Sequence, residues 1–464
     1  MSKNKKVQER MERNMVEKIV EKQREFFHTD QTKDITFRIR QLKKLKYAIR
    51  QKEDRILEAL YLDLGKSKTE AFMTEVAMVY SEIDTALKQV KKWSRPRRVW
   101  GSMGTFPSVD YVYSEPYGVV LIMSPWNYPF NLTMSPLVAA MAAGNCAVLK
   151  CSRTSLHTAN VMKEILDETF ERRYISCLEI DTAYDAVLHQ KYDYIFFTGS
   201  PGVGKKVMSA ASQHLIPVSL ELGGKSPCII EESADIRLAA KRIAWGKFLN
   251  AGQTCISIDY VLIHESVKEK FIRELKRELE ERYDIGSKTY PRIINRHHFD
   301  RLCELIRTEE HVIGGQTDEA ANKIAPTIFP DSDFDREIMK EEIFGPLLPV
   351  ISYRHLAEVI RKVKELEKPL ACYLFTNRKE VADQVIHSIS YGGGCINDVV
   401  VHFTNHRLPF GGVGLSGMGS YHGKYGFDAL SHKKGVVKSI RGIDLPFRYQ
   451  PFDDKKWKLF KKIF

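Results

Sequence analysis

The chain has 464 residues, of which 43% are hydrophobic and 28% charged, an ordinary globular composition with enough apolar material for a buried core. A formal net charge of +12 favours anionic partners, but no zinc-finger spacing, RNP-like strand or glycine-flanked basic box is present, so we expect no nucleic acid partner. The eight cysteines form no C-x-x-C pair, no secretory apolar region opens the chain, and no apolar run approaches the roughly 20 residues of a spanning helix, so we expect a reduced, cytoplasmic protein.

The first part of the chain, from about residue 10 to residue 95, is predicted to be helical. Apolar residues recur there at helical spacing with arginine and lysine between them, at Ile35, Ile39, Leu42, Leu45 and Ile49. Gly65 is expected to end the next helix, because glycine accepts the left-handed backbone of a helix end. Residues 109–115 alternate loosely in polarity and are predicted to form a strand or hairpin.

Beyond this point, strands and helices are predicted to alternate. Short apolar runs predict strands at residues 119–123, 146–150, 175–180 and 194–198, with helices at 136–143 and 154–170. A second region of the same kind follows over residues 227–405 and includes a helix at 266–283, before a strand at 435–440 and a basic tail. Continuous apolar strands between helices indicate an α/β fold with parallel sheets covered on both faces, an architecture that binds ligands at the carboxyl ends of its strands.

Three segments together contain the parts of a thiol-based active site. Cys255 lies within Asn-Ala-Gly-Gln-Thr-Cys-Ile, Glu221 lies upstream within Leu-Glu-Leu-Gly-Gly-Lys-Ser-Pro, and Asn127 lies within Ser-Pro-Trp-Asn-Tyr-Pro-Phe. A thiol nucleophile, a carboxylate base and an amide donor are what chemistry through a covalent thioester requires.

These segments resemble those of the aldehyde dehydrogenase superfamily, as do residues 197–200 and 341–346. The glycine-rich ending at 408–424 is similar to that of the class 3 branch, which includes fatty and aromatic aldehyde dehydrogenases. The resemblance covers nearly the whole chain, with the motifs in the family's order.

The resemblance implies a Rossmann-like parallel-sheet cofactor domain, a second α/β catalytic domain and a small bridging β element for oligomerisation. We expect residues 1–106 and 118–224 in the cofactor-binding domain, 225–405 in the catalytic domain, and 107–117 with 425–441 as bridging strands. Residues 442–464 would form a basic amphipathic tail. A homodimer is expected from the class.

The resemblance also assigns roles to the three catalytic residues. Cys255 would attack the aldehyde carbon, and Asn127 with the Cys255 backbone N–H would stabilise the oxyanion. Glu221 would then activate the water that releases a carboxylic acid. The expected substrate is a medium- or long-chain aliphatic or an aromatic aldehyde. Two alternatives stay open, a CoA-acylating enzyme and a catalytically silent membrane-binding homologue.

The glycine-rich segment that starts at Gly199 is a candidate phosphate loop. Its G-x-x-x-x-G-K spacing ends in a second lysine, Lys206, where a P-loop needs serine or threonine, so both phosphate binding and a plain glycine turn fit. By the resemblance, this loop, framed by Gly199 and Gly204, lies against the pyrophosphate of NAD or NADP, with Ser200 at a phosphate and Val203 near the adenine. A G-x-G-x-x-G match at residues 412–417 has no strand before it and is interpreted as chance.

Further cofactor contacts are expected at Lys150 and Arg153. The family pattern is Lys-Pro-Ser-Glu, and this chain has Lys-Cys-Ser-Arg, so Arg153 reverses the charge that repels a 2′-phosphate. The hypothesis is that NADP is tolerated or preferred; the alternative is that Arg153 faces solvent. Glu342 and Phe344 match positions at the nicotinamide ribose and ring, although a charged helix start and a core phenylalanine would also explain them.

Two remaining features concern metals and membranes. His297 and His298 form a bare pair without further ligands nearby, so we expect no metal site. The tail places Trp457, Phe460 and Phe464 on one helical face among lysines. Such a helix can lie on an anionic membrane surface or pack over protein.

Overall fold

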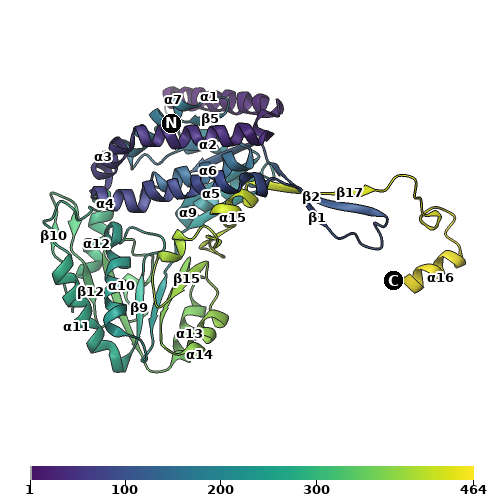
Figure 1. Ribbon diagram of the computed structural model, residues 1–464. Helices are drawn as coiled ribbons and strands as arrows, with labels where there is room; N and C mark the ends of the chain where they lie inside the picture. Colours follow the sequence, from purple (N-terminus) through teal and green to yellow (C-terminus); the bar gives the residue numbers. More distant parts are fainter. Residues whose placement is uncertain (1–2, 464) are drawn as a thin grey trace.

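The computed structural model describes residues 3–463 and contains two parallel sheets, a layer of N-terminal helices and a projecting arm (Figure 1). The helical layer consists of α1 (Lys3–His28), α2 (Ile35–Gln51), α3 (Glu53–Leu64), α4 (Lys68–Ala71) and α5 (Ala77–Trp93). The predicted stripe on α2 faces inward, since Leu42, Leu45 and Ile49 are fully buried. Gly65 ends α3 with a φ of 70°, as its sequence position predicted.

The first sheet has the strand order β16-β7-β6-β3-β4-β5, and all of its pairings are parallel except that of β16. Its strands are β3 (Val119–Met123), β4 (Cys146–Lys150), β5 (Ile175–Cys177), β6 (Tyr194–Gly199), β7 (Val218–Leu222) and β16 (Gly417–Met418). The intervening helices are α6 (Asn131–Ala143), α7 (Leu156–Thr169), α8 (Tyr184–Leu188) and α9 (Pro201–Ser212). The chain order reverses between β3 and β6, and ligands of doubly wound sheets bind at such a switch point.

The second sheet is entirely parallel, with the strand order β12-β13-β9-β8-β14-β15. Its strands are β8 (Pro227–Ile230), β9 (Tyr260–His264), β12 (Thr327–Phe329), β13 (Leu347–Tyr353), β14 (Ala371–Phe375) and β15 (Gly393–Ile396). The accompanying helices are α10 (Ile236–Phe248), α11 (Glu265–Arg282), α12 (Arg296–Arg307), α13 (Leu356–Glu365) and α14 (Lys379–Ser388). A two-stranded ribbon, β10 (Thr317–Asp318) with β11 (Lys323–Ile324), lies outside this sheet. The two sheets are joined by residues 223–226, the segment in which the expected domain boundary falls.

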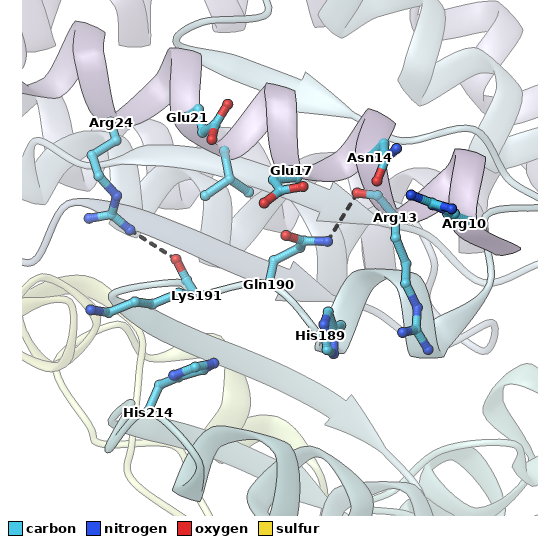
Figure 2. A pocket seen from close by; sticks show the side chains of 11 residues that line it. Arg10, Arg13, Asn14, Glu17, Glu21, Arg24, His189, Gln190, Lys191 and His214 are labelled. Carbon is cyan, nitrogen blue, oxygen red and sulfur yellow. Dashed lines mark hydrogen bonds between the residues drawn. The ribbon is translucent and has the colours of Figure 1, made fainter.

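Helix α1 is attached to the first sheet by polar contacts along its length. The Gln23 side chain donates to the Ala147 carbonyl at 2.9 Å, and Arg24 pairs with Asp193 at 2.9 Å. Beside these contacts an open cleft of about 740 Å³ is lined by α1 and by residues 189–191 and His214, and Gln190 donates to the Arg13 carbonyl at 3.1 Å within it (Figure 2). The cleft also holds Glu17 and Glu21, so its charge is mixed.

The arm is an antiparallel sheet of β1 (Arg97–Val99), β2 (Ser108–Pro116) and β17 (Ser431–Ser439), which extends away from both larger sheets (Figure 1). Helix α15 (Gly423–Ala429) leads into β17, and α16 (Asp454–Ile463) lies at the far end. Among the described residues no helix combines the length and hydropathy needed to cross a membrane.

Candidate active site

Cys255 follows a strained turn that lies between α10 and β9. Asn250, Ala251 and Gly252 have φ values of 54°, 51° and 74°. Left-handed backbone is costly for residues other than glycine, so the surroundings must hold it. They do so through Asn250: its side-chain amide donates to the Asn127 carbonyl at 2.9 Å, and its backbone N–H donates to Glu70 at 2.7 Å. The turn presents a half-buried thiol with a fixed direction.

Asn127 is hydrogen-bonded to the same turn. Its side-chain amide donates to the Gln253 carbonyl at 3.1 Å, which uses one of its two N–H groups. Its own carbonyl accepts from Lys66, whose ammonium pairs with Glu75 at 2.6 Å in a fully buried ion pair. The structure therefore brings Asn127 and the loop of Cys255 together, and it adds a buried ion pair that the sequence did not reveal.

Glu221 lies within β7 and is fully buried, with neither carboxyl oxygen hydrogen-bonded among the described residues. Burial raises its pKa well above the ordinary value. Burial likewise raises the pKa of Cys255 to about 12, and the nearby charges of Glu342 and Glu221 add to this effect. Both groups are therefore harder to ionise here than in water.

Glu342 and Phe344 lie at the junction of the two sheets. A side chain at Gly223 would collide with the Glu342 carboxyl group, which accepts the Gly224 backbone N–H. Burial and Asp259 raise the pKa of Glu342 to about 8. Phe344 has a φ of 50° and its ring meets Trp126 edge-on at a centroid distance of 5.4 Å.

The glycines that follow β6 differ in how closely other residues pack against them. Ser200 precedes α9 with an extended backbone and makes no side-chain cap hydrogen bond, and Gly202 has open space where a side chain would stand. Gly204 instead packs against Leu222, which a larger residue would strike. Val203 lines a groove together with Tyr184 of α8. Gly204 therefore lets α9 approach β7, whereas the start of the helix is left open to a ligand.

Lys150 and Arg153 lie at the carboxyl end of β4. The Lys150 ammonium donates to the carbonyls of Ile180 and Cys151 at 2.7 and 3.1 Å, and burial lowers its pKa. Arg153 is exposed beside it. A helix N-terminus with an uncapped hydroxyl after β6, beside the switch point of the first sheet, and cations at the carboxyl end of β4 suit the phosphates and ribose of a dinucleotide.

An apolar cavity of about 140 Å³ adjoins Cys255. Its wall includes Met73, Met78, Leu132, Trp245, Leu249, Ile256, Val400, Val401 and Phe403. Sequence reasoning did not single out these residues, because apolar positions on separate helices and loops carry no pattern that distinguishes a cavity wall from a core.

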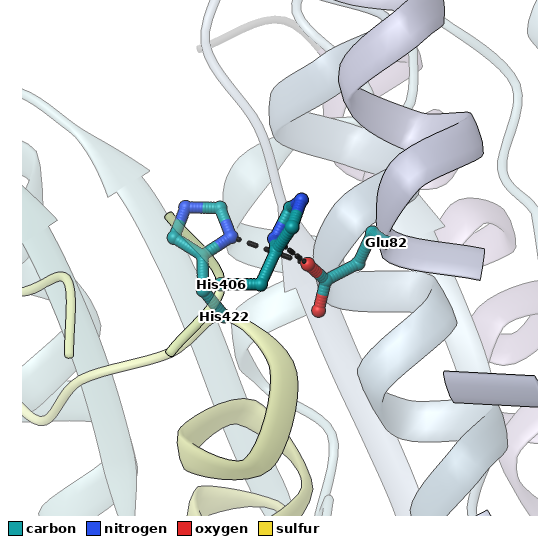
Figure 3. Close-up of side chains that lie close together, drawn as sticks. All are labelled: Glu82, His406 and His422. Atoms are coloured by element: carbon teal, nitrogen blue, oxygen red, sulfur yellow. Dashed lines mark hydrogen bonds and ion pairs between the residues drawn. The ribbon is translucent and has the colours of Figure 1, made fainter. Parts of the chain in front are cut away.

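The segment that carries Phe403 is tied to α5 by a buried cluster of Glu82, His406 and His422 (Figure 3). The Glu82 carboxylate accepts the Gly423 backbone N–H at 2.7 Å and faces a ring nitrogen of each histidine. His297 and His298, the pair noted in the sequence, are adjacent rings whose centroids are 5.5 Å apart. The carboxylate–histidine group that the structure does contain was missed, since its members lie on distant segments.

The 412–417 glycines also have a role that the sequence did not reveal. Gly417 pairs with Glu221 across β16 and β7, and a side chain there would strike the Leu220 carbonyl. Gly417 thus lets β16 approach β7, whereas a side chain at Gly412 would strike Ser416 within the same loop.

Residues 4–436 match the model of the Aldehyde dehydrogenase family. The chain belongs to the aldehyde dehydrogenase family. It is 46% identical over 444 residues to 4,4'-diaponeurosporen-aldehyde dehydrogenase of Staphylococcus aureus, covering 93% of this chain and 96% of that protein. It is 42% identical over 426 residues to the dimeric NADP-preferring aldehyde dehydrogenase of Rattus norvegicus, covering 91% and 94%.

A solved structure of the substrate-bound state of Staphylococcus aureus AldH superposes on this aldehyde dehydrogenase with a TM-score of 0.94 at 44% identity. The match covers 97% of this chain and 99% of that one. The expected fold and class 3 resemblance are therefore confirmed. The enzyme oxidises an aldehyde to the carboxylic acid with NAD or NADP as hydride acceptor.

Proposed function

We propose that Cys255, Glu221 and Asn127 carry out this oxidation on an apolar aldehyde. The observation that carries the proposal is the half-buried thiol of Cys255, which lines an apolar cavity directly after a turn that is hydrogen-bonded to Asn127. The Cys255 sulfur attacks the aldehyde carbon, and the free N–H of Asn127 with the Cys255 backbone N–H binds the resulting oxyanion. NAD or NADP, when bound, accepts the hydride that leaves this carbon.

Glu221 completes the reaction by taking a proton from the water that hydrolyses the thioester on Cys255. Because burial raises the pKa of Glu221, the carboxyl group must lose its proton before it can act as the base. Its lack of hydrogen-bond partners among residues 3–463 leaves it free to reorient towards water. No observation favours the CoA-acylating or the catalytically silent alternative.

The test replaces each group separately. Cys255→Ala is expected to abolish NAD(P)H formation, whereas Glu221→Gln retains thioester formation and loses its hydrolysis. Intact-mass measurement of Glu221→Gln after addition of aldehyde and cofactor should therefore find the acyl group on Cys255. A Glu221→Gln enzyme that turns over at the wild-type rate, or one that needs CoA for release, would overturn the assignment.

For the substrate, we favour medium- and long-chain aliphatic or aromatic aldehydes. The lining of the cavity is almost wholly apolar, so it recovers free energy from an alkyl or aryl group and offers little to a sugar-like aldehyde. A relative is named for a 4,4'-diaponeurosporen-aldehyde. Rates measured across aldehyde chain length should rise with apolar surface, and a preference for short hydroxylated aldehydes would contradict this.

Lys150, Ser200, Val203, Glu342 and Phe344 are proposed to hold the cofactor, with Gly199 and Gly204 shaping the loop. We also propose that Arg153 lets the enzyme accept NADP, since a cation beside the ribose attracts a 2′-phosphate. Arg153→Glu should weaken NADP binding while leaving NAD binding near its original value. Equal effects on the two cofactors would show that Arg153 does not contact the phosphate.

The enzyme is further proposed to be a cytoplasmic homodimer that contacts membranes through its tail. The relative named as dimeric supports the assembly, and eight free thiols in the described chain are typical of a reducing compartment. The arm offers a strand edge for a second copy, and α16 offers a cationic surface.

A further inference from the structure

Two buried thiols lie in contact beside the proposed cofactor segment. The sulfur atoms of Cys151, just after β4, and Cys177, at the end of β5, are 3.9 Å apart and within hydrogen-bond range. Cys151 is 3% exposed and Cys177 4% exposed. Among residues 3–463 no other pair of cysteine sulfurs is in such contact.

The surroundings make the two thiols unequal. The hydrogen bond with Cys177 lowers the pKa of Cys151 against the effect of burial, and the Lys150 ammonium lowers it further. The pKa of Cys177 is raised by the same hydrogen bond and by burial. Cys151 is thus the more readily ionised partner and the better nucleophile, and Cys177 is placed to react with it afterwards.

We infer that Cys151 and Cys177 form a reversible disulfide bond on reaction with peroxide, and that this bond weakens cofactor binding at Lys150. The second half of this inference rests on the proposed role of Lys150. The Cys151 sulfur attacks one peroxide oxygen and the O–O bond breaks. Cys151 becomes a sulfenic acid, and one water molecule is released. The Cys177 sulfur then attacks the Cys151 sulfur, an S–S bond replaces the S–O bond, and a second water leaves. The two thiols are oxidised by two electrons and the peroxide is reduced.

The geometry links this bond to Lys150. An S–S bond is about 2.0 Å long, so the sulfurs must approach by roughly 2 Å. Leu149 and Cys177 are neighbours in the β4–β5 pairing, and Cys151 lies two residues further along, so the approach draws the segment after β4 towards β5. The Lys150 ammonium is bonded to the carbonyls of Cys151 and Ile180, which lie on the two segments that would move.

The experiment uses the full chain carrying Cys255→Ala, so that oxidation of that thiol cannot contribute. After treatment with hydrogen peroxide, peptide mass spectrometry without reduction should find Cys151 linked to Cys177, with the loss of two hydrogens. NADPH binding, followed by its fluorescence, should weaken about tenfold and recover with dithiothreitol. Adding Cys177→Ala should remove both effects, whereas adding Cys146→Ala, which removes a buried thiol at the start of β4, should leave both intact.

Failure of the disulfide, of its effect on cofactor binding and of the cofactor role of Lys150 would each give a different result. Absence of the linked peptide under conditions that oxidise the half-buried thiol of Cys303 would overturn the disulfide. A linked protein that binds NADPH as tightly as the reduced one would overturn the coupling. If Lys150→Met does not weaken NADPH binding, the proposed cofactor role of Lys150 fails, and the linked peptide still decides the disulfide.

Discussion

The thiol of Cys255 is surrounded by groups that oppose its ionisation. Burial raises its pKa to about 12, and the carboxyl groups of Glu342 and Glu221 contribute further. A raised cysteine pKa means that the reactive thiolate is scarce at neutral pH and increases as the pH rises towards that value. Without its cofactor, the enzyme is therefore expected to have a slowly reacting nucleophile.

We predict that alkylation of Cys255 by iodoacetamide rises about tenfold per pH unit from pH 7 to 10 without levelling off. Glu342, whose pKa is raised to about 8, becomes charged above that pH, so Glu342→Gln should accelerate alkylation mainly above pH 8. Peptide mass spectrometry would follow the site, with Cys303 as an internal comparison. A plateau near pH 8 would mean that the thiol is not held in this environment.

The sequence offered candidate residues for the site but not their surroundings. Asn127, Cys255 and Glu221 could be proposed because each lies in a motif that is continuous in the chain. The Lys66–Glu75 pair was missed, since a lysine and a glutamate at these positions are indistinguishable from surface residues until burial is known. Gly204 was assigned to the cofactor loop, but its neighbour is Leu222, a contact that only the packing of α9 reveals.

At the scale of elements, the Glu82 cluster joins α5 to the segment that lines the substrate cavity. Three groups converge on one buried carboxylate: the rings of His406 and His422 and the backbone N–H of Gly423. Although burial alone would raise the pKa of Glu82, the hydrogen bonds from the two histidines lower it to about 2. The carboxylate is thus ionised and fully partnered at neutral pH.

We predict that Glu82→Gln lowers the free energy of unfolding by about 2 to 3 kcal/mol, because hydrogen bonds to a buried charge are lost. Denaturant unfolding at pH 7 would measure the change. Asp84→Asn, on the same helix but in a partly exposed pair with Lys46, should cost less than about 1 kcal/mol. Equal losses of unfolding free energy for the two variants would argue that the Glu82 cluster does not stabilise the attachment of the cavity-lining segment to α5.

The bounds of helices and strands could be predicted from the sequence only where an uninterrupted apolar run marked the element. The strands at residues 119–123 and 146–150 were predicted with the bounds that the structure has, because their apolar runs are uninterrupted. The helix expected at 136–143 begins earlier, at Asn131, with Pro136 inside it, since tertiary packing buries the whole helix. The strand expected at 175–180 ends at Cys177, and β16 was missed because a glycine and a methionine alone carry no strand signal.

On the scale of the whole molecule, the arm leaves an open edge. In the sheet order β1-β2-β17, β17 is an outer strand, and Val437 on it is 51% exposed. An exposed edge of this length pairs with another chain unless it is blocked. We propose that a second copy covers it.

Val437→Asp is therefore expected to shift the enzyme from dimer to monomer, because a charge in the covered surface must be desolvated. Light scattering after size-exclusion chromatography would give the mass, which should be twice the 53.4 kDa of the chain for the unaltered enzyme. Leu215→Asp changes another exposed apolar residue, remote in sequence from the arm, and should leave the dimer intact. A dimeric Val437→Asp enzyme would place the contact elsewhere.

The tail beyond the arm presents apolar and cationic groups to solvent. In α16, Trp457 is 60% exposed and Leu459 is also exposed, with lysines before, between and after them. In the view of Figure 1, this helix lies away from both large sheets. Phe464, which the sequence placed on the same helical face, lies outside the described residues. A helix of this kind gains free energy from anionic lipid through both its charge and its buried aromatic area.

The full chain is predicted to sediment with vesicles that contain phosphatidylserine, and less so with neutral vesicles or at high salt, since each lysine near an anionic surface contributes about 1 kcal/mol. A chain ending at Asp453 should remain in the supernatant, and Trp457→Ala should lie between the two. If the tail instead packs on the partner subunit, removing it would leave sedimentation unchanged and alter the KM for long-chain aldehydes. That result would reassign α16 from membrane contact to the subunit interface.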